Sequence, residues 1–104
     1  MSPNEPEYRV VYSEAIRSAL NTYVDVLLLA GWEKQAVRAL VTSMDNNLKR
    51  NPTYFGNPLY SLKTSKIIIN VGFVRPLAAQ FGIHEKSKSV FVRKLILMTT
   101  KKSP

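Results

Sequence analysis

The residue types that could carry chemistry in this chain are basic side chains and a single histidine, His84. Cysteine is absent, which excludes disulfides, thiol nucleophiles and Cys-ligated zinc. The sequence also offers no glycine-rich phosphate loop, no paired carboxylates and no cluster of metal-ligating residues. It therefore predicts neither a metal nor an organic cofactor. The remaining candidates are cations, which bind and neutralise anions.

The positive charge lies in the second part of the chain. Residues 1–48 contain four Lys or Arg and six acids, a net charge of −2, whereas residues 49–104 contain eleven Lys or Arg and one acid, a net charge of +10. This asymmetry indicates a polyanionic partner, first of all nucleic acid, although a solubilising surface or a contact with an acidic protein would have the same composition. The candidate nucleic-acid contacts are Lys49, Arg50, Tyr60, Arg93, Lys94, Lys101 and Lys102.

Several aromatic and polar residues allow both a functional and a structural interpretation. Tyr54, Phe55 and Tyr60 stand near cations and could stack on unpaired bases. They could equally fill the gap between helices and sheet, which we favour for Phe55. Histidine can act as a general base, but His84 directly precedes a polar turn, where a structural role is favoured. Three polar residues alternate with apolar neighbours and could form a polar sheet face: Asn70, Gln80 and His84.

Helices and strands must position these side chains. Apolar residues recur at helical spacing over residues 14–30 and 32–50, with Ser13 as the expected N-cap and Gly31 as the residue that ends the first helix. Residues 51–60 are rich in turn formers. Segments of strand composition are 7–12, 66–74, 77–84 and 89–99. The last of these is apolar on both faces, so we expect it inside the sheet.

The resulting order, β-α-α-β-β-β, predicts an α+β fold in which an N-terminal strand and an α-hairpin pack on a mostly antiparallel C-terminal sheet. The 104 residues suit one domain, residues 7–100, with a loose tail at 1–6 and a basic tail at 101–104. The acidic, proline-rich start is unlike a signal peptide, and the apolar run at 24–31 is far shorter than the ~20 residues of a membrane span. We therefore expect a cytoplasmic protein.

Three local motifs point to a known family. Residues 8–13 read YRVVYS, an opening strand followed by a helix start. Residues 51–62 fit the pattern N-P-x-x-F-G-x-P-L-x-x-L after the hairpin. In residues 76–92 a strand that runs into Glu85 is followed by a V-x-V strand. In this order and spacing the motifs resemble the RelE/ParE toxin superfamily over roughly residues 8–98.

The resemblance implies the toxin of a two-gene toxin–antitoxin system, held inactive by an acidic antitoxin protein. RelE-like members cleave mRNA on the ribosome without a metal, and ParE-like members inhibit DNA gyrase. By position, the resemblance makes Lys63, Lys66 and Arg75 the candidate catalytic residues of a metal-independent endoribonuclease.

The chain departs from the family pattern at other catalytic positions. Ala78 stands where the family has an arginine, and neither arginine nor tyrosine follows the last strand. Lysine does not replace the bidentate grip of arginine on phosphate. A non-catalytic binding module, either gyrase-inhibitor-like or a domesticated family member, is therefore the alternative function.

Overall fold

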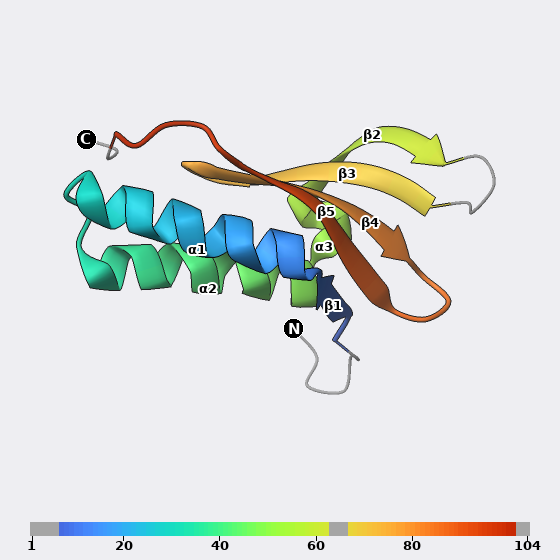
Figure 1. The fold of residues 1–104 in the computed structure, drawn as a ribbon. Coiled ribbons are helices and arrows are strands. Elements are labelled where there is room, and N and C mark those ends of the chain that lie inside the picture. Colours follow the sequence, from blue (N-terminus) through green and yellow to red (C-terminus); the bar gives the residue numbers. More distant parts are fainter. Residues whose placement is uncertain (1–6, 63–66, 102–104) are drawn as a thin grey trace.

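The computed structural model describes residues 7–62 and 67–101. Its elements are β1 (Arg9–Tyr12), α1 (Glu14–Leu29), α2 (Lys34–Arg50), α3 (Pro52–Phe55), β2 (Gly56–Leu62), β3 (Ile67–Val74), β4 (Leu77–His84) and β5 (Ser89–Leu97). The helices α1 and α2 run antiparallel along one face of the sheet (Figure 1). The predicted α+β architecture is confirmed.

The described strands form one five-stranded sheet in the order β1-β5-β4-β3-β2. Strands β2 to β5 are antiparallel to their neighbours, whereas β1 pairs in parallel with β5, with Val10 opposite Val90. The chain between these two parallel strands contains the α-hairpin, α3 and the strands β2 to β4, which is more than the dozen or so residues that a parallel pair requires. Strand β5 has a neighbour on each side, as its apolar composition predicted.

The ends of α1 follow local capping rules. The Ser13 hydroxyl accepts a hydrogen bond from the backbone N–H of Ile16 at 3.2 Å and satisfies one free donor of the first turn. At the other end Gly31 has a φ of 99°, which a side chain would disfavour. The N–H of Trp32 then bonds the carbonyl of Leu27 at 3.0 Å, and the N–H of Gly31 bonds that of Leu28 at 3.1 Å. This Schellman motif turns the chain into α2.

The core lies between the α-hairpin and the helix side of the sheet. Leu27 of α1 and Leu48 of α2 are 1% and 0% exposed, and Phe81 of β4 and Val90 of β5 are 0% exposed. They belong to one cluster of buried side chains. Burial of an aliphatic or aromatic side chain of this kind contributes about 1.5–3 kcal/mol, so this layer carries much of the stability.

Phe55 fills the gap between the helical layer and the sheet, as we expected from the sequence. Its ring stacks on Phe81 with centroids 6.0 Å apart and an interplanar angle of 15°. The ring also lies over Gly72 of β3, where an added Cβ would come within 2.6 Å of Phe55 Cδ2. Glycine at position 72 therefore makes room for the ring.

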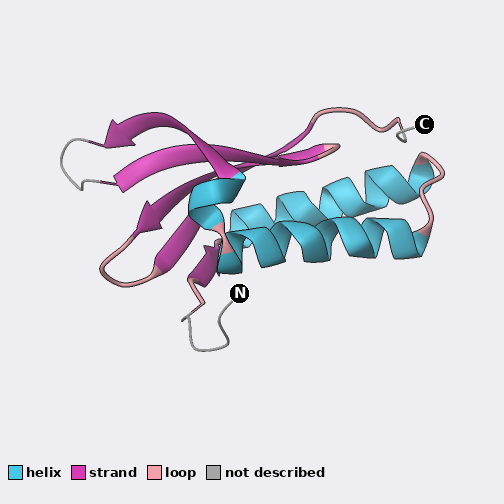
Figure 2. Ribbon diagram, turned by 180° about the vertical axis from the view of Figure 1, so that it is seen from behind, coloured by secondary structure: helices cyan, strands magenta, loops and turns pink. Residues whose placement is uncertain are grey.

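The segment 51–60, expected to be rich in turns, contains the short helix α3 and the first part of β2. Gly56, Asn57 and Pro58 disfavour strands, so composition pointed away from this assignment. Strand β2 lies at the edge of the sheet, where a proline is tolerated because one row of backbone donors is unpaired. Pairing with β3 thus decides the structure of this segment. Figure 2 shows α3 between α2 and β2.

The chain after β5 returns toward the turn of the α-hairpin (Figure 1). The indole N–H of Trp32 donates to the carbonyl of Thr100 at 2.8 Å, and the N–H of Met98 bonds the carbonyl of Pro76 at 2.8 Å. Lys101 is exposed. The predicted tail at residues 1–6 and the residues after Lys101 lie outside the described part. The helices described within 7–62 and 67–101 are all too short or too polar to span a bilayer.

Candidate nucleic-acid interface

The face of the sheet turned away from α1 and α2, here called the open face, carries the basic residues of the strands. The five described strands contain three Lys or Arg and no acid. These cations are Arg9 of β1 and the neighbours Arg93 and Lys94 of β5, and all are exposed. Strand alternation places Arg9 on the open face, because Val10 packs against the core.

A β-bulge places Arg93 and Lys94 on the same face. Val92 pairs with Phe81, but Lys94 pairs with Gln80, so Arg93 is an extra residue in β5. Val92 and Leu95 are both buried against the helices. The two consecutive cations between them therefore both point to the open face, which a regular strand would not allow. The apolar spacing of Val90, Val92, Leu95 and Leu97 is the sequence signal for this bulge.

A second bulge, in β2, directs Tyr60 toward Arg93. Pro58 pairs with Asn70 and Tyr60 with Ile69, which leaves Leu59 as the extra residue. The Arg93 Nη1 donates to the Tyr60 hydroxyl at 3.4 Å. Since β4 and β3 lie between β5 and β2, this contact spans the middle of the open face.

Exposed aromatic side chains share the open face with these cations. Tyr60, Phe73 and Phe91 are 48%, 45% and 39% exposed. Phe73 pairs with Ala78 and Phe91 with Gly82, which places both rings on the open face. Exposed rings next to cations on an open sheet can stack on unpaired bases while the cations bind phosphates. The sequence had suggested Tyr60 for such contacts but not Phe73, Phe91 or Arg9.

Three cations outside the open face are engaged in ion pairs, and two of them, Lys49 and Arg50, are predicted nucleic-acid contacts. At the end of α2 the Lys49 ammonium is 2.8 Å from Asp45 Oδ2, and Arg50 Nε is 3.5 Å from Glu7 Oε1. The carboxylate of Asp45 raises the pKa of Lys49. In the β4–β5 turn the Lys88 ammonium is 3.1 Å from Glu85 Oε2. The described cations of residues 49–104 thus do not gather on one surface.

Of the three candidate catalytic residues, only Arg75 lies within the described part of the chain. Arg75 is exposed in the turn after β3. Lys63, Lys66 and Lys102 lie outside the described residues. Leu62 of β2 and Ile67 of β3, the chain neighbours of Lys63 and Lys66, lie at the end of β3 opposite to Arg75. An eight-residue strand spans roughly 26 Å, so Arg75 is far from this end of the sheet.

The three polar strand residues do not share one face. The register pairs Asn70 with Phe81, so Asn70 lies on the helix side, and Gln80 lies opposite Lys94 on the open face. His84 Nδ1 is 2.6 Å from the Ser87 hydroxyl, which donates to the Ser89 hydroxyl at 3.0 Å. His84 therefore orders the β4–β5 turn, consistent with its structural interpretation.

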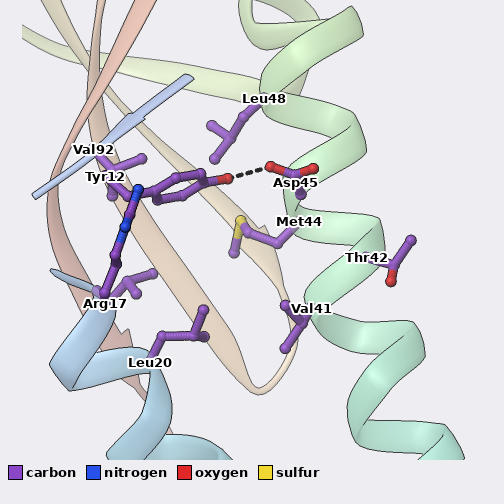
Figure 3. Close-up of a pocket in the computed structure, with 10 residues that line it drawn as sticks. Tyr12, Arg17, Leu20, Val41, Thr42, Met44, Asp45, Leu48 and Val92 are labelled. Atoms are coloured by element: carbon purple, nitrogen blue, oxygen red, sulfur yellow. Dashed lines mark hydrogen bonds between the residues drawn. The ribbon is translucent and has the colours of Figure 1, made fainter. Parts of the chain in front are cut away.

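A second candidate surface is an apolar cavity of about 270 Å³ between α1, α2 and the sheet (Figure 3). Val41, Met44, Leu48 and Leu95 are among its apolar lining. It continues along the hairpin into a hollow that shares Val41 and Thr42 with it. We call the two together the hairpin groove, whose polar or basic lining residues are Tyr12, Arg17, Lys34, Arg38, Thr42 and Asp45.

The acid of the hairpin groove is neutralised within the fold. The Tyr12 hydroxyl donates to Asp45 Oδ1 at 2.5 Å, and Lys49 pairs with the other oxygen of that carboxylate. Burial, the hydrogen bond to Asp45 and its charge raise the pKa of Tyr12. Arg17 borders the same cavity and forms no ion pair with a described residue. The unpaired charge of the hairpin groove is therefore positive.

No group of three or more His, Cys, Asp or Glu side chains that could hold a metal ion occurs within the described ranges. Comparison with models of protein families, with curated proteins and with solved structures gave no significant match.

Proposed function

We propose that the protein is a toxin-like member of a RelE/ParE-type toxin–antitoxin system that acts in the cytoplasm by binding RNA or the translation machinery. The observation that supports this proposal is the open face, where the described strands carry three cations and no acid. The motif resemblance to RelE/ParE toxins adds the biological class.

The binding mode follows from the side chains of the open face. Arg9, Arg93 and Lys94 bind phosphates, and Tyr60 and Phe91 offer rings for bases to stack on. Single-stranded RNA fits this arrangement better than a duplex, because its bases are free to leave the stack. Sequence preference is weak in this mode, since phosphate contacts and stacking tolerate every base.

RNA binding does not require cleavage. A metal-independent endonuclease needs a base, an acid and cations around one phosphate. Arg75 is the one candidate catalytic residue within the described residues, and Ala78 stands where the family pattern has an arginine. This departure from the family pattern favours the alternative of a non-catalytic binding module, either gyrase-inhibitor-like or domesticated.

The partner that we propose is an acidic antitoxin protein with an amphipathic helix in the hairpin groove. The hairpin groove is apolar at its floor and has three cations along it, Arg17, Lys34 and Arg38, none of which pairs with a described acid. From Lys34 to Leu48 the α2 side of the groove is roughly 21 Å long, about four helical turns. An acidic helix of about four turns with apolar residues along one side matches this length and charge.

Salt-dependent RNA binding tests the proposal. For a fluorescently labelled single-stranded RNA, the logarithm of the binding constant falls with the logarithm of salt concentration by about 0.7 per phosphate contact. The double variant Arg93→Gln, Lys94→Gln should therefore reduce this slope by about 1.4. The matched control Lys49→Gln, Lys88→Gln removes the same charge from ion-paired positions and should leave the slope unchanged. Equal effects of both variants would contradict an interface on the open face.

Two further measurements separate the versions of the function. Primer extension on translated mRNA detects cleavage, and a supercoiling assay detects gyrase inhibition. For the partner, we expect the neighbouring reading frame to encode a short acidic protein that copurifies with this chain. Charge reversal by Arg17→Glu with Arg38→Glu should weaken that complex. If the complex instead depends on Arg93 and Lys94, the partner lies on the open face and not in the hairpin groove.

A further inference from the structure

A hollow lies on the helix side of the sheet, beyond the end of the helical layer. Strands β2, β3 and β4 continue past α3, so no described helix covers this part of the sheet (Figure 2). The hollow has a volume of about 380 Å³, within the range of roughly 300–1,000 Å³ typical of small-molecule sites. Its lining residues are Thr53, Pro58, Ile68, Asn70, Ile83, His84, Glu85 and Lys86.

Part of the wall of this hollow is apolar and comes from Pro58, Ile68 and Ile83. Ile68 is 47% exposed, although it lies on the same side of the sheet as the buried Phe81. Ile83 is its partner across β3 and β4, and Pro58 of β2 lies on the other side of β3. Aliphatic side chains arranged around a hollow in this way suit a flat, apolar ring.

One polar side chain, Asn70, is built into the inner end of the hollow. Asn70 is only 4% exposed, and its Nδ2 donates to the carbonyl of Ile68 at 3.1 Å. Its Oδ1 accepts no hydrogen bond from a described residue. Every fully buried side-chain oxygen or nitrogen of the described residues has a hydrogen-bond partner. The Asn70 Oδ1 has none, so it is not fully buried, and it opens into the hollow that Asn70 lines. A nearly buried amide with an open acceptor is rare unless water or a ligand satisfies it.

The charges at the rim favour a ligand with a phosphate. Lys86 is exposed and forms no ion pair with a described acid. Glu85 is held instead by the Lys88 ammonium at 3.1 Å and by the Tyr8 hydroxyl at 3.0 Å, and these two donors lower the pKa of Glu85. The carboxylate is thus already paired, which leaves Lys86 as the available charge of the hollow.

We propose that this hollow binds an adenine base, with Asn70 contacting the base and Lys86 the phosphate attached to its ribose. An asparagine amide offers a donor and an acceptor side by side, and adenine presents the complementary pair at its 6-amino group and N7. Hypoxanthine carries an oxygen in place of that amino group, and uracil is smaller and has no N7. The site is therefore expected to distinguish adenine from hypoxanthine by the 6-amino group.

The adenine can come from a free nucleotide or from an RNA strand. The hollow is on the opposite side of the sheet from Arg93 and Lys94, so it does not rest on RNA binding at the open face. Binding of free adenosine monophosphate identifies a nucleotide site. If only an oligoadenylate binds at the hollow, the adenine belongs to an RNA that wraps around the sheet edge.

The test is a titration of the ¹⁵N-labelled full-length protein with adenosine monophosphate, followed by NMR and calorimetry. We expect shifts at the Asn70 side-chain amide and at Ile68, Ile83 and Lys86, and affinity reduced about tenfold or more for inosine monophosphate. Asn70→Leu should reduce affinity for adenosine monophosphate by the same factor. The control Gln80→Leu removes an amide from the open face and should have no effect.

Comparison of adenosine with adenosine monophosphate tests the proposed contact between Lys86 and the phosphate. Lys86→Gln should weaken binding of the monophosphate without changing that of adenosine, and this exposed substitution leaves the fold intact. If Asn70→Leu fails to fold, the comparison of adenosine and inosine monophosphates on the unmodified protein still tests the contact of Asn70 with the base. Equal affinity for inosine and adenosine monophosphates, shifts confined to the open face, or no binding of either nucleotide or oligoadenylate would overturn the proposal. None of these results decides whether RNA binds at the open face, because the salt-slope measurement tests that separately.

Discussion

The contact between Phe55 and Gly72 allows a quantitative test of how α3 is held on the sheet. In Gly72→Ala the new Cβ would lie 2.6 Å from Phe55 Cδ2 and 2.7 Å from Cζ, so the ring must move. Loss of the stack on Phe81 costs about 0.5–1.5 kcal/mol, and overpacking costs about 1–3 kcal/mol. Replacing glycine in a strand otherwise stabilises by about 0.4–1 kcal/mol. We therefore expect a net loss of about 2–3 kcal/mol in the free energy of unfolding.

A double-mutant cycle in urea, followed by far-UV circular dichroism, measures this contact. With the ring removed in Phe55→Ala, Gly72→Ala should become neutral or stabilising, which gives a coupling energy of about 2–3 kcal/mol. Gly82→Ala serves as a control, because the atoms that it meets are methyl ends of Ile67 at 2.7 Å and Ile69 at 3.2 Å, which can move more easily. If Gly72→Ala costs the same with and without the Phe55 ring, the steric explanation is wrong.

Two further predictions concern the α-hairpin. Tyr12→Phe should cost about 1–2 kcal/mol because it removes a hydrogen bond to the Asp45 carboxylate. Because the folded protein raises the pKa of Tyr12, its contribution is complete below a pH of about 10, the pKa of an unfolded tyrosine, and is lost as the pH rises further. Urea titrations across alkaline pH should show this loss in the native protein and a weaker loss in Tyr12→Phe. Gly31→Ala should cost about 1–2 kcal/mol from backbone strain alone, since no atom lies within 4 Å of the added Cβ, and thermal unfolding would check it.

Much of the fold follows from local patterns in the sequence. The helical spacing of apolar residues, the Ser13 cap and Gly31 located both helices of the hairpin. The strand at 77–84 was also evident from composition, and the one expected at 89–99 is present and ends at Leu97. Strand β2 was not, because Gly56, Asn57 and Pro58 disfavour a strand and only the partner β3 makes it one. Tertiary pairing overrides local propensity at a sheet edge.

The candidate site was less predictable because it depends on register. The charge of residues 49–104 could be counted, but the sequence position of a lysine does not tell which surface it occupies. Arg93 and Lys94 share a face only because a bulge breaks the alternation of β5. The contact of Arg93 with Tyr60 joins strands that are separated by two others. Likewise, Asn70 and Gln80 lie on opposite faces because of the pairing between β3 and β4.

The parallel pairing of β1 with β5 links the first described strand to the last across some eighty residues, with Arg9 opposite Ser89. During synthesis the α-hairpin leaves the ribosome long before β5, so its apolar side has no sheet to pack against. Residue pairs this distant in sequence slow folding, because a long loop must close before they form. The nascent chain therefore carries an exposed apolar helix pair until β5 emerges, and such exposed apolar surface favours aggregation during that interval.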